Sequence, residues 1–194
     1  MAESIPALSF FAGSVGSMAK AGIFPALFLA VAISAAAAAQ EAGIAPRQSQ
    51  LTCGRTIVSA NAMCYGATSL CLRETLTFRR TEGSTTLAPH AQTHSHPAAS
   101  GGNVPALDYR ATSWTCAPGR NGGHYVAVLM VRASGADCGE CQYLRLYHPN
   151  GSLIAATLTF DADGRARGNE KGATLVQKVL GRPWPEGLKL IYDR

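Results

Sequence analysis

Two cysteines in the C-terminal half have the spacing of a redox site. Cys138 and Cys141 form a Cys-x-x-Cys pair that follows the apolar stretch HYVAVLMVRA. In a thioredoxin-like site such a pair lies at a helix N-terminus, which stabilises the thiolate. Here the residues after Cys141 alternate between apolar and polar types and soon reach Pro149, so they predict a strand instead of that helix. We interpret the pair as structural, with a thiol–disulfide oxidoreductase as the alternative.

A structural zinc site needs four ligands, and one Cys-x-x-Cys pair supplies two. No second such pair is present, and the spacing of Cys64 and Cys71 is too wide for a zinc knuckle. An even number of cysteines in an exported chain is typical of disulfides. We expect Cys116 to pair with Cys138 or Cys141, and the remaining one of these to reach the N-terminal half. The expected disulfide cysteines are Cys53, Cys64, Cys71, Cys116, Cys138 and Cys141.

Three histidines in the segment HAQTHSHP are weak candidates for a metal site. Imidazoles at the spacing of His90, His94 and His96 can collect zinc, copper or nickel. The segment has no carboxylate nearby in the sequence and no ordered scaffold to orient the rings. We therefore expect no functional metal and no cofactor, and keep a periplasmic metal-binding protein as an alternative. His124 and His148 are expected at the surface or in turns.

Motifs for calcium binding and for hydrolase chemistry are incomplete or absent in the sequence. Asp161-Ala-Asp-Gly resembles the start of a calcium loop, but positions six and twelve hold Ala166 and Gly172 instead of Gly and Glu. The chain has no Gly-x-Ser-x-Gly elbow and no carboxylate pair in a recognisable context. We therefore expect a protein that is not an enzyme.

The N-terminus predicts export. Lys20 precedes an apolar stretch that ends in a run of alanines, which is typical of a secretory signal peptide cleaved before Gln40. Translation beginning at Met18 would give this signal a compact leader. The expected location is periplasmic or extracellular, with the membrane involved only through the transient signal peptide. A net charge of +5 without a dense basic block disfavours nucleic-acid binding.

The rest of the chain has the periodicity of strands. Alternation places Leu76 and Phe78 on one face of a strand that begins near Leu70. Consecutive antiparallel strands are expected at 124–132, 142–148 and 152–160, with a tight turn at Pro149-Asn-Gly between the last two. One helix is expected over 171–181, because Leu175, Val176, Val179 and Leu180 have helical spacing and Gly181 marks its end. LKLIYD is a possible last strand.

These patterns divide the chain into a signal peptide (1–39), a loose polar tail (40–52), a small Cys-rich β-hairpin region (53–88), a disordered His/Pro/Gly-rich loop (89–106) and a main antiparallel domain (107–194). The expected fold class is mainly β, a disulfide-stabilised meander or sandwich-like sheet with one C-terminal helix. The expected function is that of an exported, non-enzymatic binding, inhibitor or immunity-type protein. Its expected partner is an envelope or secreted protein.

Overall fold

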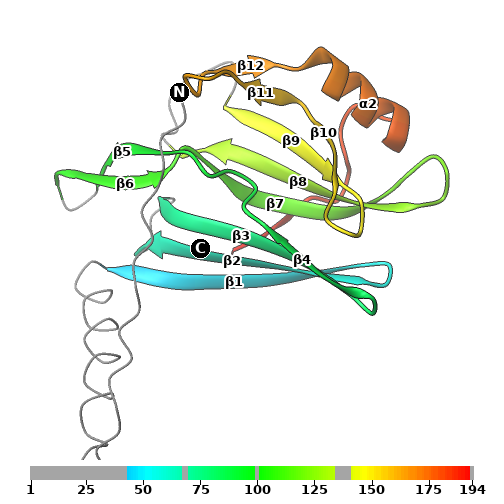
Figure 1. Ribbon diagram of the computed structural model, residues 1–194, viewed down its shortest axis with the longest axis horizontal. Coiled ribbons are helices and arrows are strands. Elements are labelled where there is room, and N and C mark those ends of the chain that lie inside the picture. Colours follow the sequence, from blue (N-terminus) through cyan, green and yellow to red (C-terminus); the bar gives the residue numbers. More distant parts are fainter. Residues whose placement is uncertain (1–42, 67–69, 99–100, 134–140, 193–194) are drawn as a thin grey trace, which may run out of the picture. The chain divides into compact units, whose positions relative to one another are not determined.

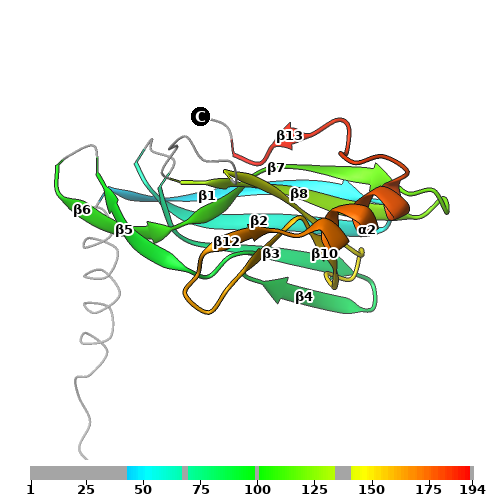
Figure 2. The same cartoon turned by 90° about the horizontal axis from the view of Figure 1, so that it is seen from above.

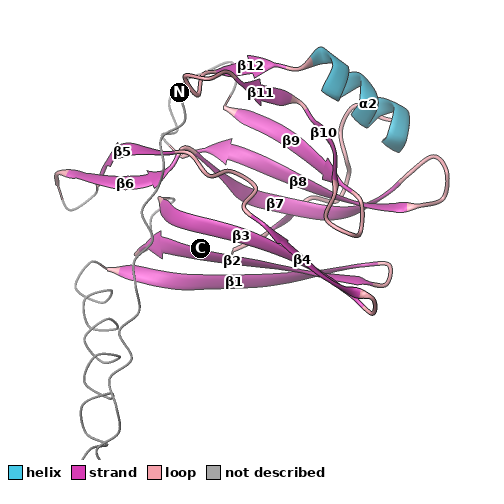
Figure 3. Ribbon diagram, in the orientation of Figure 1, coloured by secondary structure: helices cyan, strands magenta, loops and turns pink. Residues whose placement is uncertain are grey.

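Antiparallel strands make up most of the protein, as the computed structural model shows (Figure 3). The structure describes residues 43–66, 70–98, 101–133 and 141–192. The chain divides into two units, 1–36 and 37–194, and every described residue belongs to the second. The predicted signal peptide and the start at Met18 lie outside the described residues. Among the described residues, no helix has the length and apolarity needed to span a membrane.

The first sheet contains four strands that are neighbours in sequence order: β1 (Ile44–Cys53), β2 (Thr56–Tyr65), β3 (Cys71–Arg80) and β4 (Gly83–Leu87). The predicted loose tail is therefore wrong over most of its length, because β1 occupies it and pairs with β2 along its whole course. Paired strands are joined by hydrogen bonds between backbone groups, which do not depend on apolar side chains. A polar edge strand can therefore form without apolar alternation in its sequence.

The second sheet has the strand order β10-β9-β8-β7-β13. Its strands are β7 (Tyr109–Pro118), β8 (His124–Arg132), β9 (Gln142–Tyr147), β10 (Leu153–Ala156) and β13 (Lys189–Leu190). The predicted succession of antiparallel strands is confirmed for β8, β9 and β10.

The third of these predicted strands, 152–160, is divided at Thr157. After β10 the chain leaves the second sheet, and β11 (Leu158–Phe160) pairs with β12 (Ala166–Gly168). The backbone N–H of Thr157 donates to the carbonyl of Leu144, and its Oγ1 accepts from the N–H of Leu144, both at 2.9 Å. These bonds hold Thr157 at the sheet edge while the residues that follow turn away.

A hairpin replaces most of the predicted disordered loop. β5 (Thr93–Pro97) and β6 (Asn103–Leu107) form a two-stranded sheet of their own, which falls within 89–106 except for Leu107. The hydroxyl of Tyr65 donates to the carbonyl of Pro105 at 2.9 Å, which ties this hairpin to β2. The segment has too little apolar content to reveal a strand from its sequence, and its order comes from backbone pairing and polar ties.

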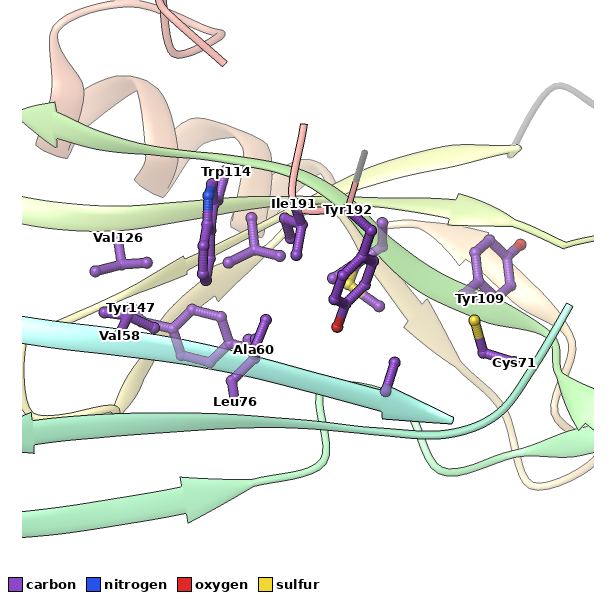
Figure 4. Packing of buried hydrophobic residues seen from close by; sticks show 14 of the residues in the cluster. Val58, Ala60, Cys71, Leu76, Tyr109, Trp114, Val126, Tyr147, Ile191 and Tyr192 are labelled. Atoms are coloured by element: carbon purple, nitrogen blue, oxygen red, sulfur yellow. The ribbon is translucent and has the colours of Figure 1, made fainter. Parts of the chain in front are cut away.

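The main core lies between the first and second sheets, which form two layers (Figures 1 and 4). Val58 and Leu76 of the first sheet face Trp114 and Tyr147 of the second, and all four are buried. The alternation predicted for β3 is confirmed at Leu76 and Phe78. The last described residues, Ile191 and Tyr192, also point into this core (Figure 4).

Helix α2 (Glu170–Leu180) covers the other face of the second sheet (Figure 2). Its buried Val176 and Leu180 pack in one cluster with Leu144 and Leu146 of β9. Asn169 caps the helix by accepting from the N–H of Gly172 at 3.1 Å. Gly181 ends it with φ of 77°, a left-handed conformation that suits glycine. The predicted helix is confirmed, with its start one residue earlier.

Candidate functional site

Two of the predicted histidines meet a carboxylate. His94 and His96 lie two residues apart on β5 and therefore share a face of the strand. His94 Nδ1 is 2.6 Å from Asp108 Oδ2, and His96 Nε2 is 3.4 Å from Asp108 Oδ1. Asp108 directly follows β6, so hairpin pairing supplies the carboxylate that the local sequence lacks.

The third histidine has a different environment. His90 is buried, and its ring centroid lies 5.3 Å from that of Tyr109 and 5.1 Å from that of Phe160. Burial lowers the pKa of His90, which favours the neutral imidazole inside this aromatic cluster. Within the described part of the chain, no group of three or more His, Cys, Asp or Glu residues is arranged to hold a metal ion.

The disulfides differ from the predicted pairing. Cys53 is bonded to Cys116, and Cys64 is bonded to Cys71. The predicted bridge from Cys116 to Cys138 or Cys141 is wrong because the end of β1 and the end of β7 lie opposite each other in the two layers, with a Cα–Cα distance of 5.1 Å between the bonded residues. The Cys53–Cys116 bond therefore links the two sheets.

The Cys-x-x-Cys pair lies at the entry to a strand. Cys141 is disulfide-bonded, and β9 begins at the next residue, Gln142. The strand predicted after the pair is thus confirmed, and no helix N-terminus follows Cys141. Cys138 lies outside the described residues.

A pocket of about 780 Å³ lies at one end of the two sheets. We call it the end pocket. It is formed by the β1–β2 turn, the end of β3, the start of β8 and the β9–β10 turn. Its lining residues are Cys53, Gly54, Arg55, Thr56, Arg80, His124, His148, Pro149, Asn150 and Ser152.

Basic side chains dominate the charge of the end pocket. Four separate segments supply Arg55, Arg80, His124 and His148, and no Asp or Glu is among the described lining residues. Arg80 forms a 3.1 Å ion pair with Glu82 outside the pocket, and both side chains are well exposed. Such an exposed pair contributes little stability, so Arg80 can exchange Glu82 for the carboxylate of a ligand.

Local backbone geometry fixes two walls of the end pocket. Gly54 has φ of 60°, and a Cβ atom at this position would lie 3.2 Å from the ring of His124. The glycine thus permits the β1–β2 turn and the close approach of the imidazole. On the opposite wall Asn150 Oδ1 accepts from the backbone N–H of Ser152 at 3.0 Å and from its hydroxyl at 2.8 Å. The ring of His148 lies 5.8 Å from that of Tyr125.

The end pocket escaped the sequence analysis because no local motif encodes it. His124 and His148 were expected at strand ends or turns, and both are exposed there. What the sequence does not reveal is that their turns converge with Arg55 and Arg80. The sequence shows each of these basic residues separately, but no local signal brings them together.

Comparison with family models, with curated proteins and with solved structures finds no match for this chain.

Proposed function

We propose that the chain is an exported, non-enzymatic binding protein whose end pocket receives an acidic side chain of a protein partner. The partner is an envelope or secreted protein, and the chain acts on it as an inhibitor or immunity-type protein does, by occupying a surface. The observation that carries the proposal is the convergence of Arg55, Arg80, His124 and His148 on one pocket whose lining has no acidic residue.

Arginine suits this role because its planar guanidinium can donate two parallel hydrogen bonds to a carboxylate. The pocket volume of about 780 Å³ is ample for a side chain of a partner together with some of its backbone. The Cys53–Cys116 bond anchors the floor, since Cys53 lines the pocket. A rigid wall reduces the entropy lost on binding, which favours affinity.

Two observations support the export part of the proposal. The N-terminal sequence has the order of a signal peptide. The two disulfides formed by Cys53–Cys116 and Cys64–Cys71 suit an oxidising compartment. Mass spectrometry of protein isolated from the envelope and culture fractions tests this part directly. Detection of a mature N-terminus at Gln40 is the expected result, and a full-length chain confined to the cytoplasm contradicts it.

A fluorescent oligo-glutamate peptide is a suitable first probe of the end pocket, with binding followed by fluorescence anisotropy. We expect binding at low salt that weakens as salt rises, because the contacts are ionic. Replacing both Arg55 and Arg80 by Ala should lower the affinity by about tenfold or more, corresponding to the loss of charge-assisted hydrogen bonds.

The matched control replaces Arg73 and Arg79 by Ala. These exposed residues lie on β3 with Arg80 but outside the end-pocket lining, and the net charge changes by the same amount. The control should keep most of the binding. Equal loss in both double variants would mean that the peptide senses only net charge, and the end pocket would lose its proposed role.

A further inference from the structure

A second cleft lies at the β10 edge of the second sheet, where the chain leaves β10 and passes into β11. This side cleft has a volume of about 440 Å³ and is bounded by β9, β10, β11 and the first turns of α2. Its lining contains two cations, Arg145 and Lys171, and no Asp or Glu. Apolar side chains supply the rest of its walls, chiefly Leu158, Phe160 and Leu175.

Arg145 has no counter-ion among the described residues. None of the ion pairs formed among the described residues includes it, although its side chain is half-buried. One Nη of Arg145 donates to the carbonyl of Pro89, and its Cζ lies 5.6 Å from the ring centroid of Tyr147. Its Nε is buried without a hydrogen-bond partner among the described residues. A guanidinium carries five N–H donors, so Arg145 can bind a further acceptor in addition to the carbonyl of Pro89.

Tyr143 adds a second unused polar group to the side cleft. It lines the cleft on the same strand as Arg145, and its side chain is only 1% exposed. Burial raises the pKa of its hydroxyl and the neighbouring Arg145 guanidinium opposes this effect, but the hydroxyl makes no hydrogen bond of normal geometry within the described part of the chain. Leaving such a buried group without a hydrogen bond destabilises the folded protein. An acceptor that reached both Arg145 and Tyr143 would remove this destabilisation, and a carboxylate has two oxygens with which to do so.

We propose that the side cleft binds a small amphipathic carboxylate, a molecule with one carboxylate and a short hydrocarbon chain. Its carboxylate pairs with Arg145 and accepts from the hydroxyl of Tyr143. Its hydrocarbon chain lies along Phe160 and Leu175. This ligand differs from that of the end pocket, because the end pocket is defined by four basic residues and the side cleft by one half-buried guanidinium next to apolar walls.

Calorimetric titration of the full mature chain with octanoate tests the proposal. Saturable binding in the sub-millimolar range is expected. Octanol, which keeps the hydrocarbon chain, and acetate, which keeps the carboxylate, should each bind at least about tenfold more weakly, because each lacks one of the two interactions. Octanol binding as tightly as octanoate would overturn the role of Arg145, and the absence of saturable octanoate binding would overturn the proposal as a whole.

Arg145→Met should lower octanoate affinity by about tenfold or more, since a charge-assisted hydrogen bond is lost. Arg132→Met is the matched control, because Arg132 is exposed at the end of β8 and lies outside the side cleft. Binding unchanged in Arg145→Met, or lost equally in Arg132→Met, contradicts the proposal.

A second variant serves if Arg145→Met fails to fold. Leu175 lies on the exposed side of α2 with 38% of its surface accessible, so Leu175→Asp should leave the fold intact. The new carboxylate should repel octanoate and remove its binding while oligo-glutamate binding at the end pocket persists. Octanoate binding that survives Leu175→Asp shows that octanoate binds elsewhere. Octanoate binding tests the side cleft and oligo-glutamate binding tests the end pocket. Loss of one without the other therefore shows which of the two proposals has failed.

Discussion

The hydroxyl of Tyr192 donates a 3.0 Å hydrogen bond to Oε1 of Glu74, which lies 118 residues earlier in the chain. The other carboxyl oxygen of Glu74 accepts from the backbone N–H of Ala111 at 2.7 Å. Glu74 is buried on β3, Ala111 belongs to β7, and Tyr192 is near the C-terminus. One carboxyl group thus joins the first sheet, the second sheet and the end of the chain.

Replacing Glu74 by Gln should flatten the dependence of stability on pH. Burial raises the pKa of Glu74 from its ordinary value to about 7, while the bonds from Ala111 and Tyr192 and the charge of Arg110 lower it by less. The folded protein therefore holds a proton that the unfolded chain releases at lower pH. The stability contributed by this proton is complete below about pH 4.5 and is lost as pH rises through about 7.

Urea unfolding at a series of pH values measures this effect. From pH 4.5 to 8 the wild type should lose about 3 kcal/mol more than Glu74→Gln, at the usual 1.4 kcal/mol per pKa unit. The amide can keep one acceptor and one donor in place of the neutral acid. Glu82→Gln is the control, because Glu82 is exposed in the β3–β4 turn. Parallel pH profiles for wild type and Glu74→Gln would show that Glu74 does not titrate with a raised pKa.

The Cys53–Cys116 and Cys64–Cys71 disulfides should differ in their contributions to stability. Cys53–Cys116 closes a sequence separation of 63 residues and Cys64–Cys71 one of 7. The chain-entropy relation gives about 4 kcal/mol for the longer loop and about 2 kcal/mol for the shorter. Paired Cys→Ser variants compared by thermal unfolding check this order. A larger loss from the 64–71 pair would contradict the entropic account.

A buried aspartate on β8 should lower the free energy of unfolding more at position 126 than at position 128. Both valines are fully buried and face the first sheet, but Val128 is directly opposite Arg145 in the β8–β9 register, whereas Val126 is opposite Tyr147. An unpaired buried carboxylate costs several kcal/mol, and a neighbouring guanidinium offsets part of that cost. The free energies of unfolding of Val126→Asp and Val128→Asp measure the difference. Equal destabilisation would mean that Arg145 is not free to pair.

Gly172→Ala should destabilise the protein despite the higher helix propensity of alanine. A Cβ atom at Gly172 would lie 2.0 Å from the carbonyl oxygen of Ala156 on β10, so α2 would have to move away from the sheet. Such overpacking costs about 1–3 kcal/mol, which exceeds the propensity gain of about 1 kcal/mol. Thr174→Ala, at an exposed position of the same helix, should be neutral or slightly stabilising. A raised melting temperature for Gly172→Ala would contradict the close helix–sheet contact.

The sequence predicted elements whose signals are local. The helix was found because its apolar spacing and Gly181 agree, and the β9–β10 turn because Asn150-Gly151 favours a tight hairpin. Strand β1 was missed because its side chains are mostly polar. It is held by backbone pairing with β2 and by the Cys53–Cys116 bond.

Groups that act together across the chain could not be predicted in the same way. Alternation along β3 places Glu74 on the same face as Leu76 and Phe78, so its burial was open to inference. Its hydrogen bond with Tyr192 could not be inferred, because no local sequence pattern links residues so far apart. The end pocket could not be predicted either, because its four basic residues come together only when the turns and strand ends of both sheets meet.

The strand orders described above also have a consequence for the time course of folding. Strands β1 to β4 and β7 to β10 each add next to their predecessor in the chain, so both sheets can grow through short-range hairpins, which close quickly. Strand β13 is the exception, because it pairs with β7 from the far end of the chain. During synthesis this edge of β7 therefore stays unpaired until Lys189 and Leu190 emerge, and we expect the hydrogen bond between Tyr192 and Glu74 to form later than the hairpins of either sheet.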